Sequence, residues 1–198
     1  MQTKINATEA TAAFTFYKPE TASEPAKRLL LAIQEQYGFI PNLFAYMAEA
    51  PTTIEAYLAL NEILARTSLT PAQRQVALLA VSAQNHCNFC TTAHRALGTI
   101  EGVNEQTLAA ISQECSASDP TCSLDELQNL ALASFAQEVT NSRGKPSEIE
   151  TQNFLDAGFN RQQILEVILI ISIKTLSNYI NHLTQPEPNE ELLKMLKK

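Results

Sequence analysis

Helix-start signals recur along this 198-residue chain, and they constrain its fold more than any other feature. In a capping box, Ser, Thr or Asn is followed three residues later by Glu or Gln. This pattern occurs at residues 70–73, 123–126, 147–150 and 160–163. No stretch alternates apolar and polar residues with the period of two that a half-buried strand requires. Glycine is also scarce, with 5 residues. The sequence therefore predicts an all-α protein.

Breaks between the helical patterns predict where the helices lie. We expect helices near residues 23–36, 42–47, 51–64, 71–84, 87–98, 104–113, 123–139, 147–158 and 160–182, and a short charged helix at the end. Asn42 is the expected cap of the second. A polar linker at 116–120 separates an N-terminal half, 21–114, from a C-terminal half, 121–198. We interpret 1–198 as one helical domain in two halves.

Charge and hydropathy exclude several classes of function. The formal net charge is -7, and an acidic surface repels phosphate backbones and anionic lipids, so we expect neither nucleic acid nor a membrane as a partner. The longest apolar run, 168–173, is far shorter than the roughly 20 residues of a membrane span. We see no secretory signal and expect a cytoplasmic protein, in which the cysteines form no static disulfide scaffold.

One short segment carries residues suited to chemistry. Cys87 and Cys90 form a C-x-x-C pair, and His94 follows four residues later. On a helix these spacings place the three side chains on one face. A thiolate is the reactive form of cysteine, and both a helix N-terminus and a nearby base favour it. The pattern is typical of a thiol peroxidase or dithiol oxidoreductase.

Two other interpretations of the pair remain open at this point. The cysteines could be inert core residues, because free cysteine packs as a small hydrophobe. They could also bind zinc together with His94, with His86 or His182 as a fourth ligand. The chain has no second C-x-x-C, and we predict neither a metal nor a cofactor.

The segment 69–94 resembles the signature of the carboxymuconolactone decarboxylase and alkyl hydroperoxidase D superfamily, in its peroxidase-related branch with C-x-x-C-x-x-x-H. Segments 38–44 and 178–182 resemble two further features of that branch. The resemblance implies an alkyl hydroperoxidase D-like multi-helix bundle that forms a homo-oligomer. It also implies antioxidant peroxide reduction through a redox-active disulfide, which a protein dithiol reductant then reduces again.

One position departs from the pattern of the redox members. They carry a proton-relay glutamate twelve residues before the first cysteine, whereas this chain has Gln75. Glutamine can hydrogen-bond His94 but cannot take up a proton. The chain is therefore either a hydroperoxide reductase with an altered relay or, as the alternative, a non-catalytic, redox-sensing helical oligomer.

The remaining roles follow from position. We predict Cys90 as the attacking cysteine, with His94 as its base, and Cys87 as the resolving cysteine. We interpret Asn178, Asn181 and His182 as capping or packing residues, with a contribution to the active site as the alternative. Cys115 and Cys122 are expected to be free thiols.

Overall fold

The protein is an all-helical bundle, as predicted. The computed structural model describes residues 13–112 and 123–196, and within these ranges it contains ten helices and no strand. The helices are α1 (Glu24–Tyr37), α2 (Asn42–Met47), α3 (Pro51–Leu64), α4 (Pro71–Gln84), α5 (Asn88–Ile100), α6 (Glu105–Ile111), α7 (Leu124–Asn141), α8 (Glu148–Asp156), α9 (Arg161–Thr184) and α10 (Glu190–Met195). The expected linker, Cys115 and Cys122 lie outside the described residues.

Three of the four capping boxes form as the sequence predicts. At the start of α4, the Thr70 hydroxyl accepts the Gln73 backbone N–H, and the Gln73 side chain accepts the Thr70 N–H. The same reciprocal pairs start α7 at Ser123 and α9 at Asn160. At Ser147 the hydroxyl accepts the Glu150 N–H. These bonds satisfy backbone N–H groups that a helix leaves unpaired at its start.

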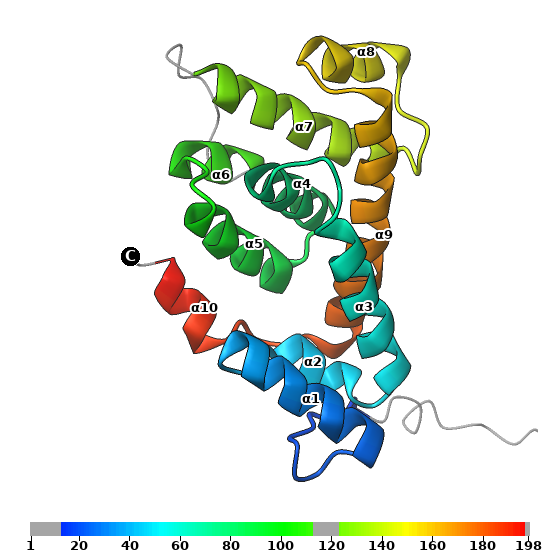
Figure 1. The fold of residues 1–198 in the computed structure, drawn as a ribbon, viewed down its shortest axis with the longest axis vertical. Helices are drawn as coiled ribbons and strands as arrows, with labels where there is room; N and C mark the ends of the chain where they lie inside the picture. Colours follow the sequence, from blue (N-terminus) through cyan, green and yellow to red (C-terminus); the bar gives the residue numbers. More distant parts are fainter. Residues whose placement is uncertain (1–12, 113–122, 197–198) are drawn as a thin grey trace, which may run out of the picture.

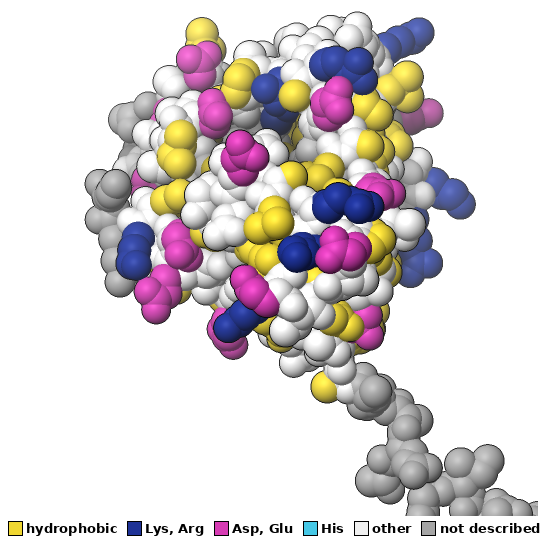
Figure 2. Space-filling model, turned by 60° about the horizontal axis from the view of Figure 1, so that its bottom comes forward, with side chains coloured by type: hydrophobic (Ala, Val, Ile, Leu, Met, Phe, Trp, Pro, Cys, Tyr) yellow, Lys and Arg dark blue, Asp and Glu magenta, His cyan; other side chains and the backbone are white. Residues whose placement is uncertain are grey.

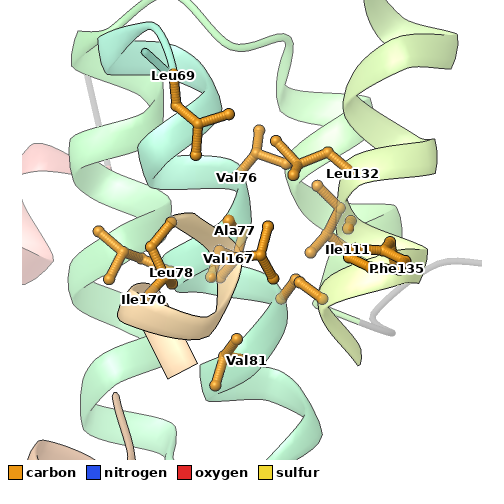
Figure 3. Close-up of a cluster of buried hydrophobic side chains, with 14 of the residues drawn as sticks. Leu69, Val76, Ala77, Leu78, Val81, Ile111, Leu132, Phe135, Val167 and Ile170 are labelled. Carbon is orange, nitrogen blue, oxygen red and sulfur yellow. The ribbon is translucent and has the colours of Figure 1, made fainter. Parts of the chain in front are cut away.

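Helix α4 lies at the centre of the bundle (Figure 1) and packs against α5, α6, α7 and α9. Its buried side chains include Val76, Leu79 and Val81, which are fully shielded from solvent. Figure 3 shows Val76, Ala77 and Val81 among side chains of α6, α7 and α9. Because this cluster joins helices from both parts of the chain, the two predicted halves share one hydrophobic core.

A second hydrophobic cluster lies beneath the cysteine pair. It gathers apolar side chains of α1, α2 and α3 around Cys87, Phe89 and Cys90, and Leu192 of α10 also belongs to it. Helix α9 runs beside both clusters, and its C-terminal end approaches α2 (Figure 1). The cysteines therefore belong to the second cluster and contact α9 through Asn181. On the face in Figure 2, acidic and basic side chains are interspersed among hydrophobic ones.

Helix α9 is, within the described residues, the one helix long and apolar enough to span a membrane by length and composition. In its most apolar stretch, 44% of the residues are buried inside the protein. Its buried residues Val167, Ile170 and Ile173 pack in the central core. A helix packed in the core of a protein can also meet this criterion of length and apolar composition.

Phe154 is expected to be a major contributor to the stability of the C-terminal part of the core. Its ring is fully buried and stacks between Phe135, at a centroid distance of 4.3 Å, and Phe159, at 4.5 Å. Phe154→Ala should lower the free energy of unfolding by about 3–5 kcal/mol, measured by urea denaturation. On the same helix Ile149 is 72% exposed, so Ile149→Ala should change it by less than about 0.5 kcal/mol. Equal losses in the two variants would contradict this account.

Candidate active site

The turn between α4 and α5 positions the cysteine pair. His86 adopts the left-handed region with φ of 55°, and the Cys87 backbone N–H donates to the carbonyl of Ser82. Cys87 is thus the N-cap of α5, and Cys90 lies in its first turn. Each cysteine is only 2% exposed. The unpaired N–H groups at the start of α5 favour negative charge at this place.

The side-chain amide of Asn181, on α9, contacts the sulfurs of both cysteines. Its Nδ2 lies 3.0 Å from the Sγ of Cys90 and 3.6 Å from the Sγ of Cys87. Asn181 is 4% exposed, and its neighbour Asn178 accepts a hydrogen bond from Asn85 at 2.9 Å. We expected Asn181 mainly to cap a helix or pack against a neighbour, and it contacts both sulfurs.

A buried lysine joins the site from α9. Lys174 is 1% exposed, and its Nζ lies 2.9 Å from the Nε2 of His94. An ammonium group can only donate, so Nε2 accepts and the ring hydrogen sits on Nδ1. Nδ1 then donates to the Oε1 of Gln75 at 2.9 Å. The polar chain therefore runs from Lys174 through a neutral His94 to Gln75.

The neutral state of His94 has a clear physical cause. Burial lowers the pKa of the imidazole well below its usual value, and the positive charge of Lys174 lowers it further. Both ring nitrogens are occupied by Lys174 and Gln75. In this arrangement His94 holds the lysine ammonium in place. Our prediction from spacing gave His94 the role of a base for Cys90, and the geometry adds Lys174 as the charged group beside the thiols.

The two cysteines have opposite acid–base properties. A hydrogen bond from Cys87 is the largest effect that lowers the pKa of Cys90, and the charge and hydrogen bond of Lys174 and the amide of Asn181 add to it. Burial opposes this shift, but the pKa of Cys90 still falls well below its usual value. The same hydrogen bond and burial raise the pKa of Cys87. The two shifts therefore favour a Cys90 thiolate with a Cys87 thiol donating to it.

Lys174 stays charged despite its burial. Burial alone would lower its pKa, but the negative charge of Cys90 and a hydrogen bond to it raise the pKa above its usual value. Tyr57 of α3 is partly buried, and burial raises its own pKa. The site therefore combines one buried cation with one buried thiolate, an ion pair in which each charge stabilises the other.

No group of three or more His, Cys, Asp or Glu side chains that could hold a metal occurs in the part of the chain that the structure describes. The cysteines face the Lys174 ammonium and the Asn181 amide, and both of these groups donate hydrogen bonds. A second cation beside the sulfurs would be repelled by the first. The side chains present suit a thiolate better than a metal ion.

A cleft of about 620 Å³ reaches the pair from the surface. Cys87 and Asn181 form part of its wall, whereas Cys90 does not line it. The other lining residues are Asn85, His86, Asn88, Phe89, His182, Gln185, Pro186, Glu187 and Pro188. The resolving cysteine of our prediction is thus the one next to the opening, and the thiolate lies one layer deeper.

Sequence reasoning missed Lys174 as a site residue. The signal was present, because Lys174 is a single cation at the end of an otherwise apolar run. Charged side chains are almost never fully buried without a partner. Its position fits the buried face of α9, which continues through Ser177, Asn178 and Asn181 at spacings of three and four residues.

Part of the sequence matches a known protein family, and the fold is similar to that of several solved structures. Residues 51–119 match the model of the carboxymuconolactone decarboxylase family. Comparison with curated proteins gives no match. Among solved structures, the alkylhydroperoxidase AhpD core of an uncharacterized peroxidase-related protein from Ralstonia eutropha JMP134 has a TM-score of 0.75 at 22% identity, covering 90% of this chain and 93% of that one.

Two further solved structures share the fold. An uncharacterized peroxidase-related protein from Silicibacter sp. TM1040 has a TM-score of 0.71 at 19% identity, covering 90% of this chain and 91% of that chain. A variant of the debrominase Bmp8, in complex with 2,3,4-tribromopyrrole, has a TM-score of 0.71 at 16% identity, covering 96% of this chain and 97% of that chain. At these identities the likeness shows the fold, while the chemistry must be argued from the site.

Proposed function

We propose that this chain, whose residues 51–119 match the model of the carboxymuconolactone decarboxylase family and whose fold is shared with alkylhydroperoxidase D-like proteins, is a cysteine-dependent hydroperoxide reductase. The single observation that carries the proposal is the environment of Cys90. Its sulfur receives hydrogen bonds from the Asn181 amide and the Cys87 thiol, beside the buried ammonium of Lys174. A stabilised thiolate with a second thiol in contact is what peroxide reduction by a cysteine pair requires.

The proposed oxidative half-reaction has two steps. The Cys90 thiolate attacks the distal oxygen of a hydroperoxide, so that an S–O bond forms and the O–O bond breaks. The departing alkoxide takes a proton and leaves as an alcohol, and Cys90 becomes a sulfenic acid. The Cys87 thiol then attacks the Cys90 sulfur, forms the disulfide and releases water. The peroxide is reduced by two electrons, and the two thiols are oxidised by two.

The proposed reductive half-reaction starts from the cleft. A dithiol reductant attacks the Cys87 sulfur, which is part of the cleft wall, and Cys90 leaves as the thiolate that Lys174 and Asn181 stabilise. The second thiol of the reductant then releases Cys87 and closes its own disulfide. In this proposal the reductant is a protein dithiol, and the enzyme acts as a cytoplasmic homo-oligomer. Light scattering after size-exclusion chromatography measures the subunit number.

The experiment that tests the function follows thiols and peroxide together. One equivalent of tert-butyl hydroperoxide should remove two thiols per chain and lower the mass by two hydrogens, and excess dithiothreitol should sustain turnover. The variant with both Cys87 and Cys90 changed to serine is the control. Peroxide consumption by that variant at the parent rate would rule the proposal out.

Gln75→Glu tests whether the missing carboxylate limits the proposed enzyme. A carboxylate at position 75 would accept the Nδ1–H of His94 and raise its pKa. The same negative charge would oppose the Cys90 thiolate, which already has Lys174 and Asn181 as partners. We therefore expect the peroxidase rate at pH 7 to change by less than about tenfold. A gain of about 10²–10⁴ would instead show that the missing base limits the enzyme.

A further inference from the structure

The positive charge of Lys174 is almost completely shielded from solvent, because the residue is 1% exposed. Over residues 13–112 and 123–196, no Asp or Glu side chain forms a hydrogen bond or an ion pair with it. Its Nζ contacts the neutral ring of His94 and the sulfur of Cys90. An unpaired buried charge is costly, so the Cys90 thiolate is the anion that stabilises the ammonium at this place.

The other groups around Lys174 are neutral. Tyr57 of α3 is a phenol whose pKa is raised by burial, and the pKa of Cys87 is raised by its hydrogen bond to Cys90 and by burial. Gln75 bonds the far side of the His94 ring, and its amide carries no charge. Among these neighbours, Cys90 is therefore the one that balances the charge of the lysine, and it does so as a thiolate.

Oxidation of the cysteine pair removes this anion. A disulfide is uncharged, so once Cys90 and Cys87 are joined, the Lys174 ammonium has no negative partner at the site. Burial then lowers the pKa of the lysine without an opposing anion. The same reaction consumes a proton, because the alcohol and the water that it forms carry three hydrogens on oxygen, whereas the hydroperoxide and the Cys87 thiol bring two.

We propose that Lys174 supplies this proton, so that the disulfide form of the enzyme contains a neutral, buried lysine. The proposal rests on the function proposed above and adds a proton donor to the same site. A thiolate, a thiol, an ammonium and a hydroperoxide give a disulfide, an amine, an alcohol and water. The two sulfurs lose two electrons, the O–O bond takes them up, and no proton comes from solvent. The amine keeps two hydrogens and still donates to the Nε2 of His94.

The proton returns to the lysine in the reductive half-reaction. A dithiol reductant brings two hydrogens to the disulfide. One of them reaches Cys87, and the other reaches the amine of Lys174 while Cys90 leaves as the thiolate. Lys174 thus acts as an acid in one half-reaction and as a base in the other. His94 does not take this role, because burial and the lysine charge keep the pKa of its ring low.

Counting protons during oxidation tests this without any peroxide. Diamide converts two thiols to a disulfide and takes up two hydrogens itself. With Cys115→Ser and Cys122→Ser as the background, Cys87 and Cys90 are the two cysteines that remain. At a pH where the ultraviolet absorbance of the thiolate shows that Cys90 is ionised, diamide should remove this absorbance without proton uptake from solvent, as a pH-indicator dye in weak buffer reports. Uptake of one proton per disulfide would overturn the proposal.

Lys174→Met has no proton to supply, so its oxidation by diamide should take up one proton per disulfide from solvent. Lys194→Met is the matched control, because Lys194 is exposed on α10, and it should take up none, like the parent. The three proteins are compared at one pH, at which the thiolate absorbance of Cys90 is complete in each of them. Equal proton uptake in Lys174→Met and the parent would contradict the assignment of the proton to Lys174.

NMR of lysine side-chain nitrogens tests the same point with Lys174 in place, whether or not the methionine variant folds. One Nζ resonance should move from the ammonium range to the amine range when diamide closes the disulfide, and dithiothreitol should reverse the change. If every Nζ stays in the ammonium range while tert-butyl hydroperoxide is consumed, the proton donor is wrong and the proposed function stands. If the amine forms but no hydroperoxide is consumed, the proposed function alone is wrong.

Discussion

Replacing Lys174 with methionine is expected to slow the reaction of Cys90 by about 10–10³-fold at any pH below the parent pKa of that thiol. A positive charge next to a thiol lowers its pKa by roughly 1–3 units, and each unit is a factor of ten in thiolate population. Lys174 is the buried cation beside Cys90, and its charge and hydrogen bond lower the pKa of that thiol. Methionine has a similar length without the charge, so the pKa of Cys90 should rise in this variant.

The pH dependence of alkylation measures this shift directly. A thiol with a lowered pKa is deprotonated at neutral pH and loses reactivity only when the pH falls through that pKa. In Lys174→Met the inflection of the iodoacetamide rate at Cys90 should move to higher pH. Lys194→Met is the matched control, because Lys194 is exposed on α10 and, among the described residues, bonds Glu190. An unchanged profile in Lys174→Met would refute the role of the lysine.

The groups around Lys174 set the range of this experiment. The titratable groups that interact with it are Tyr57 of α3, Cys90 and His94 of α5, and Cys87 at the N-cap of α5. His94 remains neutral at and below its usual pKa because burial and the lysine charge oppose its protonation. Tyr57 ionises above its usual pKa of 10.0. Between these limits Cys90 is the group whose titration the alkylation rate reports.

The helix starts were predictable from sequence because capping is a local interaction. Thr70 and Gln73 lie three residues apart, and their reciprocal hydrogen bonds depend on nothing outside the first turn of α4. The all-helical fold was therefore within reach of the sequence alone, and the structure confirms it.

Asn42 shows where local reasoning stops. We expected it to cap α2, but it is the first residue inside the helix, and its backbone N–H donates to the side chain of Asn189 at 2.8 Å. Its own Nδ2 donates to the carbonyl of Glu187. The partner that satisfies the start of α2 is thus 147 residues away, next to α10. Such a contact depends on the packing of the whole chain.

The candidate site is predictable only in part for the same reason. Cys90 and His94 lie in α5 and Cys87 is its N-cap, so their spacing predicts that they lie close together. Lys174 meets His94 across 80 residues of chain, and Asn181 meets Cys90 across 91. These contacts require α9 to pack against α5 in one particular rotation. Sequence alone offered only the unusual polarity of one face of an otherwise apolar helix.

Serine at position 90 is expected to abolish peroxide consumption, whereas serine at position 87 should spare the first turnover. In Cys90→Ser the other thiol of the pair, Cys87, is buried, and burial raises its pKa, so little thiolate is available. In Cys87→Ser the serine hydroxyl can still donate to the Cys90 sulfur. Cys90 should then react once and stop as a sulfenic acid, because the neighbouring thiol that would close the disulfide is gone.

Rapid mixing with one equivalent of tert-butyl hydroperoxide, followed by a sulfenic-acid trap and mass spectrometry, measures this difference. The trapped product should lie on Cys90 in the Cys87→Ser variant and should be absent from Cys90→Ser. The opposite pattern would exchange the two roles. That result has a physical basis of its own, because Cys87 lines the cleft while Cys90 lies deeper. Access favours Cys87, and ionisation favours Cys90. We expect ionisation to decide which cysteine attacks, because a protonated thiol is a poor nucleophile however exposed it is. The cleft also reaches Asn181, whose amide contacts the Cys90 sulfur at 3.0 Å.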